Sequence, residues 1–149
     1  MNGIDLLIEP IRKATHIYLI GDGGSAALAD HFACDLLKNC KLPAISLCSN
    51  ASLITAIAND YSFDQVYSMQ LGVLWQSGDL LIVFSTSGNS PNLFEAIRQV
   101  KNSILIAGNK GGICRASCNL YYDIAGKDQM QIEDDMLKVC HKLVRRLDE

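Results

Sequence analysis

Two short loops in this sequence carry residues that could bind an anion, and the first loop is rich in glycine. It reads Gly21-Asp22-Gly23-Gly24-Ser25 and runs directly into a segment with helical spacing. Glycines let a backbone turn tightly and approach a ligand, and the start of a helix presents free N–H groups with a partial positive charge. Because Ala26 takes the last place of a G-x-G-x-x-G spacing, the loop fits an anion site and a plain tight turn equally well.

The second loop is rich in hydroxyl groups. It combines four hydroxyls within six residues with a glycine and a following proline: Ser85, Thr86, Ser87, Gly88, Ser90 and Pro91. Hydroxyls donate hydrogen bonds to phosphate oxygens, and proline favours the first turn of a helix, so this loop predicts a phosphate site at a helix start. The alternative is that Ser90 only caps the helix. A cap needs one hydroxyl, so the other three favour phosphate binding.

The elements that must position these loops alternate regularly along the chain. Short apolar runs rich in β-branched residues predict strands at 16–21, 44–48, 80–84, 104–107 and 120–124. Segments with helical spacing lie between and after them, at 25–38, 52–58, 64–75, 91–100 and 129–147. This alternation predicts an α/β fold with three layers, in which a doubly wound, five-stranded parallel sheet carries its ligand at the carboxyl ends of the strands.

Length and composition narrow the class of protein. With 149 residues, 49% hydrophobic and 19% charged, the chain predicts one globular domain over 1–149. A net charge of −3 without a basic run argues against nucleic-acid binding. The longest apolar run inside the chain, 80–84, is far too short to cross a membrane, and the N-terminus lacks a secretion signal, so we expect a cytoplasmic location.

The six cysteines do not form a recognisable metal or disulfide pattern. Cys114 and Cys118 are the only close pair, and the second pair of a structural zinc site is missing. We therefore expect small, buried, unpaired thiols in a reducing compartment.

Over almost its whole length the chain resembles the SIS (sugar isomerase) domain family, and within it the phosphoheptose isomerase group. The resemblance is carried, in family order, by GDGGSAALADHFACDLLK (21–38), LITAIANDYSFDQVYSMQL (53–71), GDLLIVFSTSGNSPN (78–92) and IEDDMLKVCH (132–141). It implies a flavodoxin-like or Rossmann-like sheet and an aldose–ketose isomerase that interconverts sedoheptulose 7-phosphate and a manno-heptose 7-phosphate. It also implies a homo-oligomer, a dimer or a tetramer, with active sites between subunits.

The resemblance further implies a role for individual residues. The acid–base pair would be Asp35 and His141, and zinc or another divalent metal would be bound near His31, Asp35, Glu133 and His141. The expected contacts to phosphate and sugar are Asp22, Gly23, Gly24, Ser25, Asn59, Asp60, Ser85, Thr86, Ser87, Ser90 and Glu133. For Asp60, a simple turn cap remains an alternative.

The spacing of these residues agrees with such chemistry. His31 and Asp35 are four residues apart and share a helix face, whereas Glu133 and His141 lie about 80° apart around the last helix. Two imidazoles and two carboxylates can therefore converge if the two helices meet. From Ser25 to His31 a helix rises roughly 9 Å, so a sugar phosphate could reach from the loops to the histidine.

Several residues depart from the usual pattern of the group. Asp22 stands where Asn is usual, Asp35 where Glu is common, and Glu133 where Gln is common. A non-catalytic SIS module that binds a phosphosugar or bridges protein partners is therefore the alternative. A nicotinamide-dependent oxidoreductase is disfavoured, because no acidic residue ends the second strand at Cys48, and we expect no nucleotide cofactor.

Overall fold

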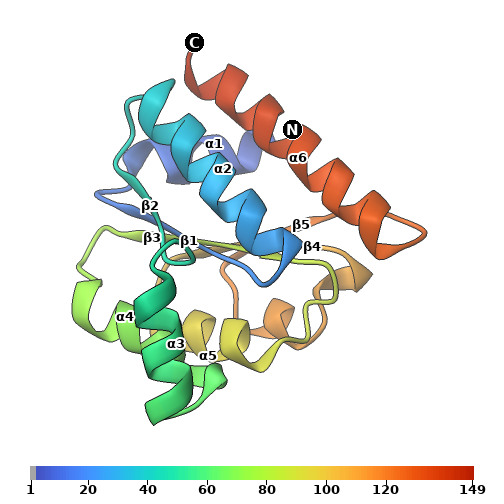
Figure 1. Cartoon of the computed structure of the whole chain (residues 1–149). Helices are drawn as coiled ribbons and strands as arrows, with labels where there is room; N and C mark the ends of the chain where they lie inside the picture. Colours follow the sequence, from blue (N-terminus) through green and yellow to red (C-terminus); the bar gives the residue numbers. More distant parts are fainter. Residues whose placement is uncertain (1–2) are drawn as a thin grey trace.

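The computed structural model describes residues 3–149 as a three-layer α/β structure (Figure 1). Five parallel strands form one sheet in the order β2-β1-β3-β4-β5. The strands are β1 (Ile17–Ile20), β2 (Ala44–Ser46), β3 (Leu80–Ser85), β4 (Ser103–Ala107) and β5 (Leu120–Asp123). Each matches a predicted strand to within two residues at either end, so the predicted fold class is confirmed.

The strand order brings the two candidate loops together. Ile17 and Ile20 of β1 pair with Leu80 and Val83 of β3, so the carboxyl ends of these strands lie side by side. β2 then lies on one side of β1, and β4 lies on the other side of β3. This point, where the winding of the sheet reverses direction, is where open α/β sheets bind their ligands.

Six α-helices among the described residues cover the two faces of the sheet (Figure 1). One face carries α1 (Asp5–Lys13), α2 (Gly24–Lys38) and α6 (Gln129–Leu147); the other carries α3 (Ala51–Asp60), α4 (Ser68–Leu74) and α5 (Pro91–Gln99). Successive residues of β1 alternate between the two cores: Ile17 and Leu19 face α2 and α6, while Tyr18 and Ile20 face the other layer. Both faces of the central strands are therefore buried, as their apolar sequences predict.

The prediction of one helix over 64–75 is wrong. A 3₁₀ turn, η1 (Phe63–Gln65), and the separate helix α4 occupy this segment. The chain turns between them at Val66 and Tyr67, and both residues are buried in the core under α4 and α5. Tertiary burial of this turn thus overrides the local helical pattern.

Helix α1 was not among the predicted helices. It is short and contains Pro10, which lacks a backbone N–H. The helix is held by burial of Leu7 and Ile11 against α6 and the sheet. Two further 3₁₀ turns, η2 (Asn109–Gly111) and η3 (Ile113–Ala116), connect β4 to β5.

Candidate active site

The glycine and serine loops line one cavity of about 250 Å³ at the carboxyl ends of β1 and β3. Phe84 and Leu93 supply its apolar lining. Its polar lining comes from Asp22, Ser25, Ser85, Thr86, Ser87, Ser90 and Gln129. Two features that were separate in the sequence therefore form a single polar site in the fold.

The serine loop is held in a fixed conformation by its own backbone. Gly88 N–H donates to Ser85 Oγ at 2.8 Å, and Asn89 N–H donates to Ser87 Oγ at 3.2 Å. Because both hydroxyl oxygens accept from the backbone, their O–H groups remain available to donate to an anion. Gly88 has a φ of +67°, and a Cβ there would overlap the carbonyl of Gly111. Only glycine fits this position.

Ser90 does not make the side-chain cap that was the alternative to phosphate binding. It precedes α5, but its side chain makes no capping hydrogen bond to the helix. Instead, Asn92 Oδ1 accepts from the N–H of Leu93 at 3.0 Å, and Ser90 lines the cavity. The capping interpretation therefore fails at this residue, which strengthens the case for anion binding.

The glycine loop forms the tight turn into α2. Gly23 has a φ of +56°, and a Cβ on Gly21 would lie 2.5 Å from the Ser25 carbonyl oxygen, so the turn requires both glycines. Ser25 is only 4% exposed and lines the cavity, whereas Gly23 and Gly24 are exposed outside it. The loop is therefore a tight turn, and this turn places Asp22 and Ser25 at the cavity.

Asp22 is fixed by a hydrogen bond across the two loops. Asn92 Nδ2 donates to Asp22 Oδ1 at 2.7 Å, which ties the β1–α2 loop to the start of α5. Burial raises the pKa of the Asp22 carboxyl, although hydrogen bonds from Asn92 and Ser90 partly offset this. A carboxyl group with a raised pKa thus faces the cavity.

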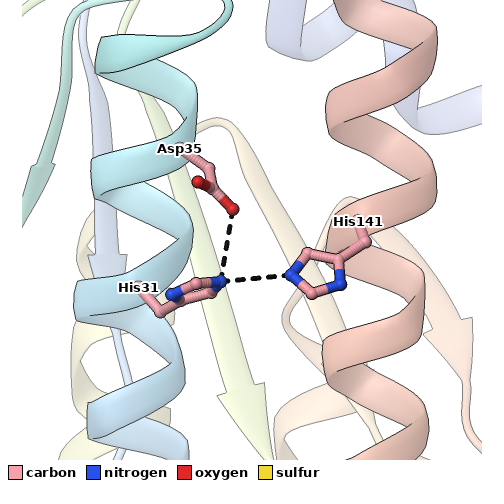
Figure 2. A group of neighbouring side chains, drawn as sticks. All are labelled: His31, Asp35 and His141. Atoms are coloured by element: carbon pink, nitrogen blue, oxygen red, sulfur yellow. Dashed lines mark hydrogen bonds and ion pairs between the residues drawn. The ribbon is translucent and has the colours of Figure 1, made fainter.

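A second cluster lies farther along α2, where it packs beside α6. Figure 2 shows His31 and Asp35 on α2 facing His141 on α6. His31 Nε2 lies 3.2 Å from His141 Nε2 and 3.2 Å from Asp35 Oδ2. The Asp35 side chain is only 14% exposed, while that of His31 is 50% exposed, so the cluster opens to solvent on one side.

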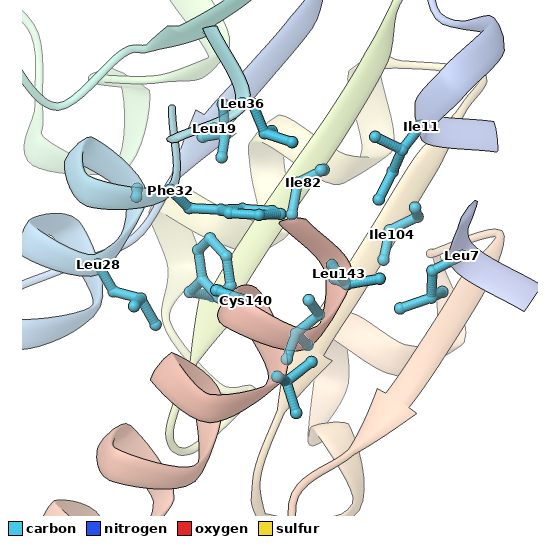
Figure 3. Close-up of a cluster of buried hydrophobic side chains, with 14 of the residues drawn as sticks. Leu7, Ile11, Leu19, Leu28, Phe32, Leu36, Ile82, Ile104, Cys140 and Leu143 are labelled. Atoms are coloured by element: carbon cyan, nitrogen blue, oxygen red, sulfur yellow. The ribbon is translucent and has the colours of Figure 1, made fainter. Parts of the chain in front are cut away.

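The hydrophobic core fixes this cluster through the neighbouring residues. Phe32 and Cys140, which adjoin His31 and His141 in the chain, are fully buried between the helices and the sheet (Figure 3). Leu36 and Leu143 extend the same packing one turn farther along each helix. Because their neighbours are locked in the core, the two histidines project from the rim of the same helix–helix contact.

The geometry of the cluster suits a divalent metal. One nitrogen or oxygen atom from each of His31, Asp35 and His141 lies within 4.8 Å of the other two. Two ligand atoms of a tetrahedral zinc ion with bonds of about 2.0–2.1 Å lie roughly 3.3 Å apart. The two distances from His31 Nε2, both 3.2 Å, match this spacing, and the third pair of ligand atoms lies within 4.8 Å. Two His and one carboxylate also leave a coordination position free, as catalytic zinc sites do.

Glu133 is not part of this cluster. Its carboxylate lies against Gly24 at the start of α2, closer to the cavity. Gly24 contacts Glu133 near the start of each helix, and His31 contacts His141 farther along both helices. The two contacts join residues with nearly the same separation in sequence, so α2 and α6 run parallel from the cavity to the His31–Asp35–His141 cluster. Glu133 therefore stands between the two sites.

Two predicted residues lie away from the cavity, and one residue was missed. Asn59 and Asp60 are exposed at the end of α3, where Asn59 Nδ2 donates to Asp60 Oδ1 at 3.0 Å. Gln129, at the start of α6, lines the cavity and was not predicted. Its signal in the sequence was its place in the first turn after the last strand, because such turns meet at the ligand-binding edge.

Known proteins are similar to this chain in both sequence and structure. The SIS domain family matches residues 2–106. A phosphoheptose isomerase from Campylobacter concisus is 38% identical over 153 residues, covering 97% of this chain and 81% of that protein. This chain belongs to the phosphoheptose isomerase family.

Solved structures of phosphoheptose isomerases agree. The protein from Neisseria gonorrhoeae superposes with a TM-score of 0.93 at 30% identity, covering 99% of this chain and 87% of that one. The protein from Francisella tularensis gives 0.92 at 26% identity, with coverages of 98% and 84%. The SIS match ends before α6, but the likeness to these phosphoheptose isomerases extends over α6 and therefore includes His141.

Proposed function

We propose that this protein is a phosphoheptose isomerase that interconverts sedoheptulose 7-phosphate and a manno-heptose 7-phosphate. One observation carries the proposal: a hydroxyl-lined cavity and the His31–Asp35–His141 cluster both lie along α2. A phosphosugar sensor needs only the cavity, whereas proton transfer needs the cluster. The SIS and phosphoheptose isomerase relatives support the same reaction class.

The substrate would lie along the first turns of α2. Its phosphate would accept hydrogen bonds from the hydroxyls of Ser25, Ser85, Thr86, Ser87 and Ser90. From Ser25 to His31 the helix rises roughly 9 Å, which matches an extended sugar phosphate. The carbonyl end would then reach the cluster, and Glu133, between the two sites, would face the sugar hydroxyls.

Asp35 and His141 would perform the acid–base chemistry. One of them removes the proton from the carbon beside the carbonyl, giving an enediol, and the proton returns to the neighbouring carbon. The other moves a proton between the two oxygens in the opposite direction. Asp35 Oδ1 also accepts from Asn39 Nδ2 at 3.2 Å, which orients the carboxylate.

We propose that the cofactor is zinc or another divalent cation held by His31, Asp35 and His141. When bound there, it would polarise the carbonyl and stabilise negative charge on the enediol oxygens. Glu133, predicted as a fourth ligand, would have to leave Gly24 to join them. Asn59 and Asp60 remain predicted sugar contacts.

We also propose that the enzyme is a homo-oligomer. The face formed by α3 and α4 carries an apolar groove lined by Leu53, Ile57, Met69, Gln70, Val73 and Leu74. Val73 is 87% exposed, which is unusual for an apolar side chain beside other apolar groups. Light scattering coupled to gel filtration would test this, and a monomer at micromolar concentration would contradict it.

We also propose that the protein is located in the cytoplasm. All six cysteines are unpaired, as a reducing compartment favours. The prediction that they are buried holds only for Cys114 and Cys140, because Cys34 is exposed and the other three are partly exposed. Separately, no helix among residues 3–149 is long and apolar enough to cross a membrane.

The reaction can be tested directly. Purified protein, with and without added zinc, is incubated with sedoheptulose 7-phosphate in deuterated water and followed by NMR. We expect the aldose product, deuterium at C2, and loss of both in His141→Ala. Saturable binding of the sugar phosphate without any exchange would contradict the isomerase and favour a binding module.

A further inference from the structure

The cavity proposed to hold phosphate contains a negative charge and no positive one. Asp22 is the single ionisable side chain among its nine lining residues, and no Lys, Arg or His lines it within the described residues 3–149. A phosphate dianion and an ionised carboxylate in one cavity of about 250 Å³ repel each other strongly. Protonation of either group would remove this repulsion.

A hydrogen bond from a buried side chain holds Asp22 at the cavity. Asn92 is 1% exposed, and its Oδ1 accepts from the N–H of Leu93, so its Nδ2 is the atom that donates to Asp22 Oδ1. The hydrogen bond therefore fixes one carboxyl oxygen as an acceptor. Ser90 is a second hydrogen-bond partner of this carboxyl group. Because a hydroxyl group can accept as well as donate, this contact still allows Oδ2 to carry a proton.

The groups around Asp22 do not supply a compensating cation. Beneath it, Tyr67 and Cys114 are neutral, because burial raises both pKa values, that of Cys114 to about 11. The starts of α2 and α5 contribute only neutral side chains and their helix dipoles. From α6 come the neutral Gln129 and the acidic Glu133 against Gly24.

We propose that Asp22 takes up a proton from solvent when the sugar phosphate binds, and that its carboxylic acid then donates a hydrogen bond to a phosphate oxygen. This inference rests on the proposed function, because it places the phosphate in this cavity. The balance is simple: Oδ2 gains one proton from the buffer, Oδ1 keeps accepting from Asn92, and no covalent bond of the substrate changes.

The burial of Asp22 agrees with this role and predicts how phosphate affinity depends on pH. Burial already raises the pKa of the Asp22 carboxyl before any ligand arrives, and a nearby phosphate raises it further. By linkage, affinity for a phosphate then falls as the pH rises above the pKa of Asp22 in the free protein, by up to about tenfold per pH unit. Asn in place of Asp would donate its N–H₂ at every pH.

The test is isothermal calorimetry at a series of values from roughly pH 5 to 9, in pairs of buffers that differ in ionisation enthalpy. The titrants are sedoheptulose 7-phosphate and inorganic sulfate, because sulfate is a tetrahedral dianion that does not titrate in this range. The wild type is compared with Asp22→Asn. Asp64→Asn, an exposed carboxylate on η1 outside the cavity, is the matched control.

We expect the wild type and Asp64→Asn to take up as much as one proton per sulfate bound, and to bind it more weakly as the pH rises. Asp22→Asn should take up none, and it should bind tenfold or more tightly than wild type at the alkaline end. Sulfate or sugar-phosphate binding with equal proton uptake in wild type and Asp22→Asn would overturn this inference and leave the proposed function standing. If the wild type, Asp22→Asn and Asp64→Asn all fail to bind either ligand at any pH, the proposed phosphate site is overturned and this inference with it.

Discussion

The carboxylate of Glu133 lies against the backbone of Gly24, the first residue of α2. A Cβ on Gly24 would lie 2.6 Å from Glu133 Oε1. The negative carboxylate thus rests at the positive end of the helix dipole, which is a favourable placement. The contact also places the Glu133 carboxylate at the end of α2 that adjoins the cavity.

This contact makes Gly24→Ala informative. The added methyl group should displace the Glu133 carboxylate, which is the flexible end of a long side chain, and should leave the fold intact. Alanine also favours a helix by roughly 0.5–1 kcal/mol over glycine, so the free energy of unfolding should be unchanged or slightly higher. We expect KM for sedoheptulose 7-phosphate to rise several-fold in steady-state assays.

Glu133→Gln is the companion variant, because it removes the charge but keeps the shape. Glu133→Ala removes the side chain altogether. If Gly24→Ala leaves KM unchanged while Glu133→Ala raises it, the position of the carboxylate at Gly24 is unimportant for binding. A comparison of Glu133→Gln with Glu133→Ala then separates the effect of the charge of Glu133 from the effect of its side-chain contacts.

Metal binding should depend on two of the three histidines. His31→Asn and His141→Asn each remove one of three ligands, so zinc affinity, measured by competition with a chelating dye, should fall at least about 100-fold. His16→Asn is the matched control, because His16 Nδ1 contacts the buried Asp79 at 3.0 Å, away from the cluster. Equal zinc affinity in all three variants would show that the metal binds elsewhere.

Asp22→Asn should stabilise the protein increasingly as the pH rises. The pKa of this carboxyl is raised in the folded state, so above the unfolded value of about 4 the unfolded chain binds fewer protons than the folded one. The wild type therefore loses stability as the pH rises through the folded pKa, at about 1.4 kcal/mol for each unit of the shift. Urea unfolding at several pH values measures the difference, and a constant gap between the two proteins would contradict the raised pKa.

Gly88→Ala should disrupt the serine loop. The residue has a positive φ, and its Cβ would meet the backbone of Gly111, which cannot move aside cheaply. We expect a loss of about 2–4 kcal/mol in the free energy of unfolding, together with weaker phosphate binding. Gly72→Ala is the control, because its Cβ would meet only the end of the Gln99 side chain. Equal, small losses in both variants would show that the loop adapts.

The sequence alone determined the layers of the fold and the two loops. Apolar runs such as 80–84, alternating with segments of helical spacing, indicate strands that are buried on both faces of a parallel sheet. The four-residue step from His31 to Asp35 fixes their shared helix face wherever the helix lies. These are local properties, set by backbone periodicity and by the chemistry of glycine and hydroxyl side chains.

Only the tertiary structure decided which residues meet. Strand order placed Asp22 and Ser90 in one cavity, and the burial of Phe32 and Cys140 set α2 beside α6 so that His31 faces His141. The tertiary structure also places Glu133 against Gly24 and Gln129 at the cavity. The offset between the parallel helices α2 and α6 depends on core packing, which no local sequence pattern encodes.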